Sequence, residues 1–460
     1  MTNTSHADIA ASLQARWPEN KVAPSLARIE ALCDLLGSPQ DSFPVIQLTG
    51  TNGKGSTAIM IESLLRALGL RTGRISSPHL VDLTERIAID GSPMDADAFD
   101  ELVAECAPFI DLVDARAIDG IPMTFFEVMT GLGYAAFFQA PVDVAVVEVG
   151  MGGSWDATSV ADAAVAVLCP IDLDHTHLLG TTPVEIAREK AGIIKAGAVA
   201  VVADQRPDVA EVIAQRCADV GARLVAEGEG FALLDRRLAV GGQVIRLEGA
   251  GGPVGDLVLP LFGEHMAHNA ALAVAAVEAF LGGKPLSSEV IAEGLAAVVA
   301  PARLEVIHRG PTVVLDTCHN PHGARATIDG VTEAFDFDPL IGVTAMMADK
   351  DVEGVLEIFA EKMSSLVCTG VGSTSRALAP DALAARAVDF FGADNVYVAS
   401  DMAEAIDKAV ALADAAGAGA GVLIAGSVIA AGEARALLVH DSSDADGADD
   451  AWLAEFEDQT

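Results

Sequence analysis

The sequence predicts a two-domain α/β protein in which helices cover mainly parallel sheets, and three observations support this. First, strand-length runs are continuously rather than alternately apolar, as in residues 45–49 (VIQLT), 142–149 (VDVAVVEV) and 163–170 (AAVAVLCP). Strands that are covered on both faces need this continuous pattern. Second, amphipathic helix-length stretches separate these runs, and third, a similar alternating series begins again at residue 312. The 460 residues are enough for two or three domains with large cores.

Composition and charge exclude several classes of protein. The formal net charge is −38 at pH 7, so we expect neither a nucleic acid nor an anionic membrane as a partner. The six cysteines stand far apart, which excludes a CxxC metal site and favours a reducing compartment. The N-terminus has no basic segment followed by an apolar one, and polar residues interrupt the apolar run 267–280. We therefore expect a soluble, cytoplasmic protein without a leader or an anchor.

The first strand, residues 45–49, is followed by the segment GTNGKGS and then by a helix. Apolar residues recur at helical spacing from Ile61 to Leu68, and Gly69 is expected to end this helix. Further along, residues 231–261 carry short apolar runs punctuated by glycine, which indicates small antiparallel hairpins. A helix is expected at about residues 266–281.

The second α/β series predicts a Rossmann-like domain, because helix-length segments separate its strands. The strand candidates are residues 312–316, 340–344, 365–369, 395–399 and 421–425. Pro301 marks a hinge, so we expect a first domain over residues 1–300 and a second over 301–440. An acidic tail, 441–460, follows, in which Trp452 and Phe456 are spaced to dock weakly on one helix face.

A glycine-rich loop between the first strand and its helix predicts a phosphate-binding loop of a parallel-sheet ATPase domain. Backbone N–H groups close on phosphate oxygens there, and Lys54 would reach the β and γ phosphates of a nucleotide. Leu48 stands where the usual GxxxxGK[ST] pattern has its first glycine, and a bare strand-to-helix turn is the alternative. The predicted nucleotide-binding residues are Gly50, Thr51, Asn52, Gly53, Lys54, Gly55 and Ser56.

Two further candidates lie where neighbouring strands end. Glu148 ends the apolar strand 142–147, and His175 follows the run 163–170. The carboxyl ends of parallel strands meet in the crevice where such sheets bind ligands, so both are expected near the phosphate loop. We interpret them as Mg²⁺ ligands; the alternatives are a surface acid and a structural histidine.

Lys190 is the third candidate, because its place in the sequence predicts burial. In residues 184–197 (VEIAREKAGIIKAG) it shares the apolar helix face of Ile186 and Ile193. A buried lysine is costly unless it is paired or modified. The alternative is a side chain that snorkels beside Glu189.

Together these features resemble the Mur-type ligases, and among them the folylpolyglutamate synthase and dihydrofolate synthase family. The resemblance covers nearly the whole chain to about residue 440, and the order and spacing of its motifs are highly specific. The motifs are residues 49–56 (TGTNGKGS), 76–80 (SSPHL), 84–87 (TERI), 124–127 (TFFE), 148–156 (EVGMGGSWD), 174–175 with 179–180, 189–195 (EKAGIIK), 303–305 (RLE) and 316–323 (DTCHNPHG).

The resemblance implies a role for individual residues of this chain. Ser77, Glu148 and His175 match Mg²⁺ ligands, and Lys190 matches a lysine that family members carry as a carbamate, a ligand of a second Mg²⁺ ion. Asn269 matches an adenine contact. Three residues of the second domain match positions that act on the nucleotide phosphates or at the domain interface: Arg303, Asp316 and His319. Three residues match positions that line the pterin pocket: Thr124, Phe126 and Asp156.

The sequence departs from the family's pattern at four positions. Ser154 and Ser159 stand where relatives usually have Arg and Asn, Met266 replaces Gln, and Cys318 replaces Ala. None of the four belongs to the predicted ATP and Mg²⁺ residues.

The resemblance implies an ATP-dependent carbon–nitrogen ligase that adds L-glutamate to dihydropteroate, to reduced folates, or to both, through an acyl phosphate. A monofunctional folylpolyglutamate synthase is one alternative, and a nucleotide-switch ATPase without ligase activity is another. A cell-wall precursor ligase would need a UDP-sugar domain before the loop, where only 44 residues precede the first strand. We expect a monomer that releases ADP and phosphate.

Overall fold

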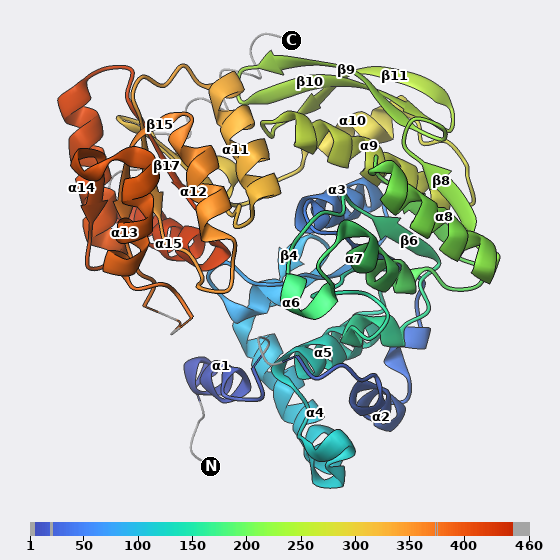
Figure 1. Ribbon diagram of the computed structural model, residues 1–460. Coiled ribbons are helices and arrows are strands. Elements are labelled where there is room, and N and C mark those ends of the chain that lie inside the picture. Colours follow the sequence, from blue (N-terminus) through green and yellow to red (C-terminus); the bar gives the residue numbers. More distant parts are fainter. Residues whose placement is uncertain (1–4, 19–21, 373, 375, 445–460) are drawn as a thin grey trace. The chain divides into compact units, whose positions relative to one another are not determined.

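The computed structural model describes residues 5–18, 22–372, 374 and 376–444, and the chain forms two compact units, Met1–Ala300 and Pro301–Thr460 (Figure 1). Trp452, Phe456 and most of the predicted acidic tail lie outside the described residues. The last helix, α15 (Val428–Asp444), continues past residue 440, where we expected the second domain to end. None of the helices in the described part of the chain has both the length and the apolar content needed to cross a membrane.

The first unit is built on an eight-stranded sheet in the order β4-β3-β2-β5-β1-β6-β7-β8. Its strands are β1 (Val45–Thr49), β2 (Thr72–Ile75), β3 (Ile87–Ile89), β4 (Ser92–Pro93), β5 (Val144–Glu148), β6 (Val165–Leu168), β7 (Val199–Val202) and β8 (Arg223–Ala226). All run parallel except β3 and β4, which add an antiparallel edge. The three strands predicted from continuous apolar runs are confirmed as β1, β5 and β6, two of them shorter than predicted.

Helices cover both faces of this sheet. They are α1 (His6–Gln14), α2 (Ala27–Leu35), α3 (Lys54–Ala67), α4 (Ala96–Arg116), α5 (Phe125–Gln139), α6 (Thr176–Leu179), α7 (Pro183–Lys190), α8 (Pro207–Val220), α9 (Glu264–Phe280) and α10 (Ser288–Ala296). Short 3₁₀ segments are η1 (Pro39–Asp41), η2 (Leu83–Arg86), η3 (Ile118–Gly120), η4 (Ala157–Val160) and η5 (Ala191–Ile193). Gly69 follows α3 with a φ of 78°, and its N–H bonds Arg66 O, so the predicted helix end is confirmed.

Strand β1 shows why its run is mainly apolar. Ile46 and Leu48 belong to the core that contains α3 and α9, whereas Val45 belongs to the core that contains α2, α4 and α5. Successive side chains of a strand point to opposite faces, so a sheet covered twice buries every position, and the polar Gln47 and Thr49 are buried with hydrogen bonds. This burial places the carboxyl end of β1, and the loop after it, between β5 and β6.

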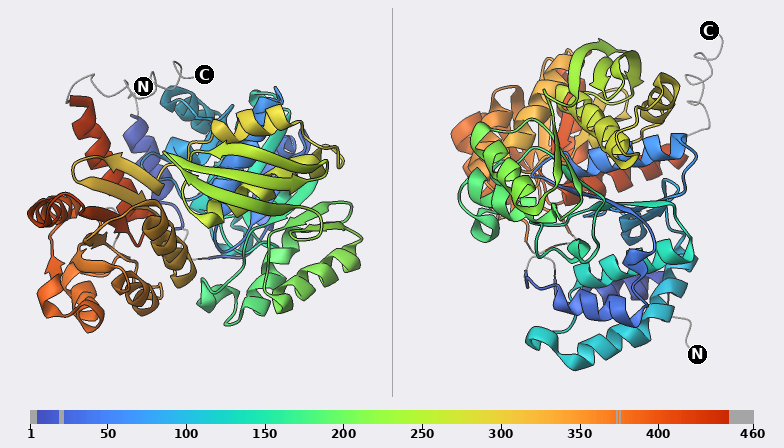
Figure 2. Two further views of the ribbon diagram at one scale, coloured as in Figure 1. Left: turned by 90° about the horizontal axis from the view of Figure 1, so that it is seen from above. Right: turned by 90° about the vertical axis from the view of Figure 1, so that its right-hand side faces the viewer.

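The predicted hairpins form a separate antiparallel sheet of β9 (Ala232–Ala239), β10 (Gly242–Gly249) and β11 (Gly252–Leu259). Figure 2 shows the three strands side by side, next to α9. Ile245, Leu247, Leu257 and Leu259 turn inward and are fully buried with α9. Helix α9 is itself apolar on nearly all sides, as a helix buried between two sheets must be.

The second unit holds a six-stranded sheet in the order β12-β13-β17-β14-β15-β16. Its strands are β12 (Arg303–His308), β13 (Thr312–Asp316), β14 (Leu340–Thr344), β15 (Met363–Cys368), β16 (Val396–Val398) and β17 (Gly421–Ala425). Its helices, besides α15, are α11 (Pro321–Ala334), α12 (Val352–Ala360), α13 (Pro380–Phe391) and α14 (Met402–Ala416), with the 3₁₀ segment η6 (Ala393–Asn395). The five predicted strands are confirmed; β12 was missed, because an antiparallel edge strand is only half-buried and has no continuous apolar run.

In the first unit, His268 on α9 makes a pH-dependent contact. Its Nδ1 lies 2.5 Å from Oε1 of Glu227, and this hydrogen bond raises the pKa of His268 above its ordinary value of 6.5. A group whose pKa rises on folding stabilises the fold fully below its unfolded pKa, and this stabilisation is lost as pH rises through the raised value. Because the His268 side chain is 41% exposed, water screens this ion pair. We therefore expect the pair to contribute less than about 1 kcal/mol to the free energy of unfolding.

We therefore expect His268→Gln to lower the thermal unfolding midpoint more at about pH 5.5 than at about pH 9. Glu227→Gln should reproduce the effect, since it removes the same charge pair. Equal losses at both pH values for His268→Gln would show that its charge contributes nothing.

Candidate active site

The phosphate loop joins β1 to α3 and its glycines are required by close contacts. Gly53 caps α3 with a φ of 86°, a left-handed conformation that favours glycine. A Cβ on Gly50 would lie 2.6 Å from Cβ of Cys169, and one on Gly53 would lie 2.8 Å from Oδ1 of Asn269. The structure therefore places Asn269, the predicted adenine contact, against the loop predicted to bind phosphates.

Two lysine side chains converge on this loop. Lys54 Nζ donates to Gly50 O at 3.0 Å, and Lys190 Nζ donates to the same carbonyl at 2.8 Å. Lys190 is only 5% exposed, so it does not snorkel to the surface. Burial, and then repulsion from Lys54, lower the pKa of Lys190 to about 7. Lys54 thus supplies positive charge beside the loop, whereas the lowered pKa of Lys190 makes its neutral amine accessible near pH 7.

The helix that carries Lys190 is shorter than its apolar stripe suggested. Helix α7 ends at Lys190 and the chain continues as the 3₁₀ segment η5 to Ile193. Ile186, Ile193 and Ile194 are all fully buried, so the inward face persists although the helical geometry changes. Lys190 thus stands at the end of α7, where it reaches the loop.

Glu148 and His175 lie at the carboxyl ends of β5 and β6, on either side of β1. Glu148 is 5% exposed, and its Oε2 accepts a hydrogen bond from the backbone N–H of Ser77 at 3.3 Å. His175 has a φ of 49° and starts α6. Thr51 Oγ1 donates to Asp172 O at 2.8 Å and accepts from Asp172 N, which ties the segment before His175 to the phosphate loop.

The chemistry of these donors fits Mg²⁺ when nucleotide phosphates complete the site. In the described part of the chain, no three His, Cys, Asp or Glu side chains are grouped as a metal cluster. Mg²⁺ is held by one or two carboxylates, water and substrate phosphates in many nucleotide sites, so a full protein cage is unnecessary. Glu148 and the Ser77 hydroxyl would supply hard oxygen ligands, and His175 an imidazole.

The glycine-rich segment after Glu148 links Lys190 to the predicted pterin pocket. A Cβ on Gly150 would lie 2.6 Å from the Phe126 ring, and one on Gly153 would lie 2.7 Å from Lys190 O. A Cβ on Gly152 would likewise lie 2.9 Å from the Trp155 ring. The segment can therefore lie between these aromatic rings and Lys190 only because residues 150, 152 and 153 are glycines.

Thr124 and Asp156 hold their own loops in place. Thr124 caps α5, where its Oγ1 accepts from Glu127 N at 3.2 Å. Asp156 is buried, and its oxygens accept from Thr158 and Met151; burial raises its pKa although these bonds lower it. The sequence prediction placed both residues in the pterin pocket only. The T-x-x-E pattern of residues 124–127 also predicts a capping box, which is the role that Thr124 has in the structure. Their contacts with a pterin stay predictions.

Ser154 and Ser159, which depart from the family's pattern, are both bonded within the site. Ser154 Oγ donates to Glu189 Oε1 at 2.6 Å, next to Lys190. Ser159 Oγ donates to Gly153 O at 2.6 Å and accepts from Gln47 Nε2 at 3.0 Å. The two serines thus stabilise the glycine-rich segment with short bonds.

The second unit brings its three candidates to one end of its sheet. Arg303 at the start of β12 lies opposite Asp316 at the end of β13 in the antiparallel register. Asp316 is buried and accepts hydrogen bonds from Leu304 N and Thr327 Oγ1, among others. Arg303 donates to Thr317 Oγ1, and His319 Nδ1 lies 3.1 Å from Thr317 O.

The backbone around Arg303 is strained. Ala302 and Leu304, on either side of it, have φ values of 52° and 47°. Non-glycine residues adopt this left-handed conformation only at a cost, and such strain gathers at functional sites. The strain supports a functional role for Arg303.

Glu85 and Arg86, in the TERI motif of residues 84–87, hold the loop before them in ways that the sequence did not predict. Glu85 accepts backbone hydrogen bonds from residues 80, 81 and 82, and so holds the SSPHL loop that carries Ser77. Arg86 is buried, donates to His79 Nδ1 at 2.8 Å and lies 4.8 Å over the Phe125 ring. It thus joins the Ser77 loop to the start of α5, a long-range contact that no local pattern predicts.

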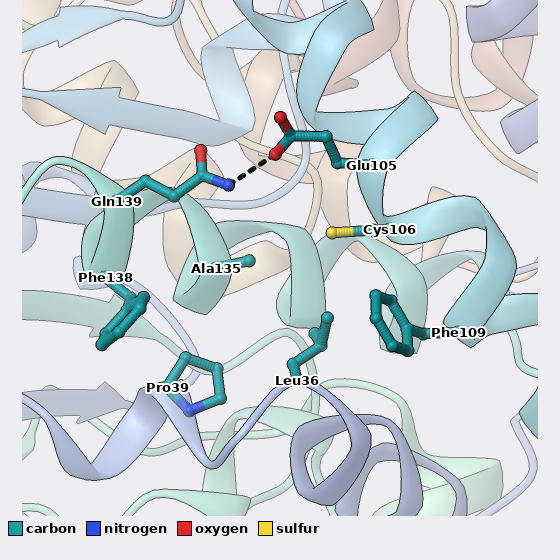
Figure 3. A pocket seen from close by; sticks show the side chains of 8 residues that line it. All are labelled: Leu36, Pro39, Glu105, Cys106, Phe109, Ala135, Phe138 and Gln139. Carbon is teal, nitrogen blue, oxygen red and sulfur yellow. Dashed lines mark hydrogen bonds between the residues drawn. The ribbon is translucent and has the colours of Figure 1, made fainter.

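A pocket elsewhere in the first unit contains none of the predicted site residues. It has a volume of about 190 Å³. Figure 3 shows its lining: Leu36, Pro39, Glu105, Cys106, Phe109, Ala135, Phe138 and Gln139. It lies at the carboxyl end of α5, whereas Thr124 and Phe126 lie at the amino end. This pocket is therefore separate from the candidate site at the carboxyl edge of the sheet.

Comparisons with known proteins agree with this geometry. Residues 302–428 match the family model "Mur ligase, glutamate ligase domain". A dihydrofolate synthase/folylpolyglutamate synthase of Mycobacterium tuberculosis is 47% identical over 93% of both chains. The M. tuberculosis folylpolyglutamate synthase complexed with ADP superposes with a TM-score of 0.91 and 45% identity, covering 94% of this chain and 98% of that one.

A more distant solved structure, E. coli FolC in complex with DHPP and ADP, gives a TM-score of 0.82 at 30% identity, over 96% of this chain and 99% of that one. The fold and the family resemblance drawn from the motifs are both confirmed. By identity, coverage and fold, the chain belongs to the dihydrofolate synthase/folylpolyglutamate synthase family of ATP-dependent ligases.

Proposed function

We propose that this protein joins L-glutamate to dihydropteroate, to reduced folates, or to both, and releases ADP and phosphate. The observation that supports this most is the convergence of Lys54 and Lys190 on Gly50 O, beside the buried carboxylate Glu148. Related structures contain ADP, AMPPCP, DHPP or folate, which are the ligands that such a reaction needs.

The chemistry requires an activated acid. A carboxylate oxygen of the pterin-bearing acid attacks the γ-phosphorus of ATP, and ADP leaves. The glutamate amine then attacks the acyl carbon, the phosphate leaves, and the amine gives up a proton to form the amide. Positioning and charge neutralisation dominate phosphoryl transfer, which suits Lys54 and Arg303. Bound Mg²⁺ would neutralise phosphate charge, held by Ser77, Glu148 and His175.

The two units divide this work in our proposal. Residues 1–300 bind ATP and the pterin-bearing acid, with Asn269 at the adenine and Phe126 at the pterin. Residues 301–440 bring glutamate, and their candidates Arg303, Asp316 and His319 already lie together. The reaction needs water to be excluded from the acyl phosphate, because water hydrolyses it. We expect the protein to act as a monomer in the cytoplasm.

We infer that Lys190 carries a carbamate in the active enzyme. Its neutral amine would add to the carbon of CO₂ and lose a proton, which gives a carboxylate that could bind a second Mg²⁺. The modification would replace the repulsion between Lys190 and Lys54 by an attraction. It also resolves the cost of burying a lysine among apolar side chains.

The carbamate can be tested by ¹³C NMR of the protein in ¹³C-bicarbonate. We expect a carbamate signal in the unmodified chain and its loss in Lys190→Met. Lys195→Met is the control, since Lys195 bonds Ser159 O, Ala161 O and Asp162 at the edge of the same segment. A signal that survives Lys190→Met would place the modification elsewhere.

The reaction itself is tested by supplying ATP, Mg²⁺ and glutamate with either dihydropteroate or tetrahydrofolate, and measuring phosphate release. We expect release to need both glutamate and a pterin-bearing acid. Phosphate release with tetrahydrofolate but not with dihydropteroate, each in the presence of glutamate, would identify a monofunctional folylpolyglutamate synthase. Release that is indifferent to glutamate and to the acid would identify a switch ATPase and overturn the proposal.

A further inference from the structure

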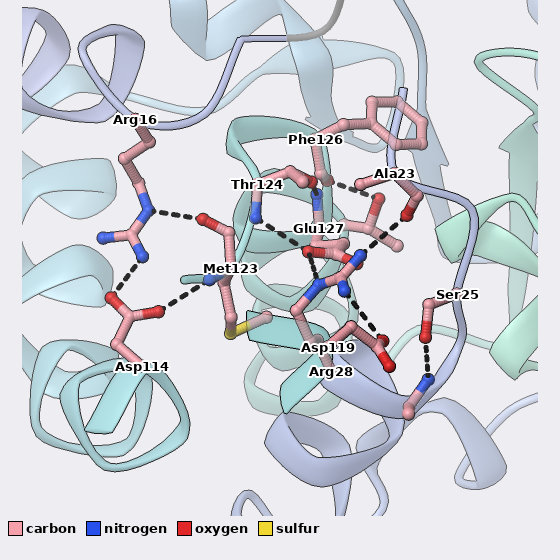
Figure 4. Close-up of polar contacts among 12 residues, drawn as sticks. Arg16, Ala23, Ser25, Arg28, Asp114, Asp119, Met123, Thr124, Phe126 and Glu127 are labelled. Atoms are coloured by element: carbon pink, nitrogen blue, oxygen red, sulfur yellow. Dashed lines mark hydrogen bonds and ion pairs between the residues drawn. The ribbon is translucent and has the colours of Figure 1, made fainter. Parts of the chain in front are cut away.

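Arg28 on α2 is the most completely buried charged residue of the described chain, with 1% of its surface exposed. Its Nε lies 3.0 Å from both carboxylate oxygens of Glu127. Nη1 donates to Asp119 at 2.9 Å, and Nη2 donates to Ala23 O at 2.7 Å (Figure 4). Each nitrogen of the guanidinium thus has a partner, and the three partners come from different segments.

Glu127, in turn, is hydrogen-bonded to Thr124 at the start of α5. Its Oε2 accepts from Thr124 N at 2.7 Å, while its own N–H donates to Thr124 Oγ1. This reciprocal capping box fixes the first helical turn, in which Phe126 lies between the two capping residues. Phe126 in turn packs against Gly150, in the segment after Glu148. Arg28 therefore bonds the capping residue that directly follows Phe126 in the chain.

A second arginine holds the residue before this turn. Arg16 Nε donates to Met123 O at 3.2 Å, and its guanidinium pairs with Asp114. Asp114 accepts from Met123 N at 2.7 Å, so both backbone groups of Met123 are bound (Figure 4). Phe125 N donates to Trp17 O at 3.1 Å. Arg16, Trp17 and Arg28 thus hold the segment 114–127 at several points.

We propose that Arg28 is a positioning residue for the pterin-bearing acid: by orienting Glu127 it sets the Thr124–Phe126 wall of that substrate's pocket. The inference rests on the proposed function. A buried ion pair contributes little net stability compared with apolar packing, whereas its directional bonds fix geometry. Only an arginine can bind both Glu127 oxygens, Asp119 and Ala23 O at once, because its donors form a rigid fork.

The test is a kinetic comparison of two variants with the unmodified enzyme. Arg28→Lys keeps the charge but loses the fork. Arg28→Met/Glu127→Gln removes both charges and keeps an acceptor for Thr124 N, so no unpaired buried charge remains. Arg325→Met is the control, since it breaks an exposed ion pair with Glu361 in the second unit. The measurements are KM for dihydropteroate, for ATP and for glutamate, kcat, and the thermal midpoint.

We expect KM for dihydropteroate to rise about tenfold or more in both Arg28 variants, because small misplacements of a binding wall are costly. KM for ATP should change less than about twofold, and Arg325→Met should leave all constants unchanged. A dihydropteroate KM that stays constant, or an ATP KM that rises equally, would overturn the proposal. So would failure of both variants to fold, since Arg28 would then serve folding. An unmodified enzyme without glutamate-dependent phosphate release would refute the proposed function instead.

Discussion

Replacing Lys54 by alanine should lower glutamate-dependent ADP release by about a thousandfold, the usual effect of removing a charge that stabilises phosphoryl transfer. Lys54 Nζ touches Gly50 O in the loop predicted to hold the β and γ phosphates. The lost ammonium would leave the developing charge on the γ-phosphoryl group uncompensated. The change is measured as ADP formed in the presence of glutamate and dihydropteroate.

The thermal midpoint of Lys54→Ala should stay close to that of the unmodified protein. The side chain is part-buried and bonds only its own loop, so little packing is lost. Lys408→Ala is the matched control; this lysine lies over the Tyr397 ring in the second unit. Full turnover in Lys54→Ala would refute the assignment of the phosphate loop.

Glu148→Ala should abolish turnover to a similar degree, because it removes the buried carboxylate that we propose for Mg²⁺. The nucleotide would then carry uncompensated negative charge next to the reacting acid. Raising the Mg²⁺ concentration should recover little activity, since the ligand itself is missing. Turnover is measured across a Mg²⁺ titration, alongside ATP binding by calorimetry.

A buried acid elsewhere separates the loss of a ligand from the loss of a fold. Glu278 is 4% exposed and accepts backbone hydrogen bonds from Ala250 and Leu286. Glu278→Ala should lower the thermal midpoint and leave kcat unchanged. If Glu148→Ala behaved in the same way and kept its turnover, Glu148 would be a structural acid.

The strands were predictable where burial on both faces imposed a simple pattern. β1, β5, β6, β13, β14 and β17 fall at or within the predicted runs because burial on both faces makes most positions of a doubly covered strand apolar. β12 escaped prediction since half of its residues face away from the core. The end of α7 at Lys190 also escaped, because an apolar stripe does not distinguish an α-helix from a 3₁₀ continuation.

The candidate site was predicted from residues that lie in short segments. Local spacing and family resemblance pointed to the glycine-rich loop, Glu148 and Lys190, and the structure places Lys54 and Lys190 on one carbonyl. The contacts of Arg28 and Glu85 were not predicted. Their partners lie in other parts of the chain or are backbone N–H groups, and neither kind of contact leaves a periodic pattern.

The amino-acid sequence by itself determined most of the strands and helices, and the glycine-rich turn between β1 and α3, because burial and glycine conformations act over a few neighbouring residues. The tertiary structure alone decided how the start of α5 is held, since Arg28 and Glu127 are separated by about a hundred residues and meet only when α2 packs on α5. The partner of a buried charge depends on which groups lie near it in the folded protein and on the cost of desolvation. Local sequence spacing predicts neither of these.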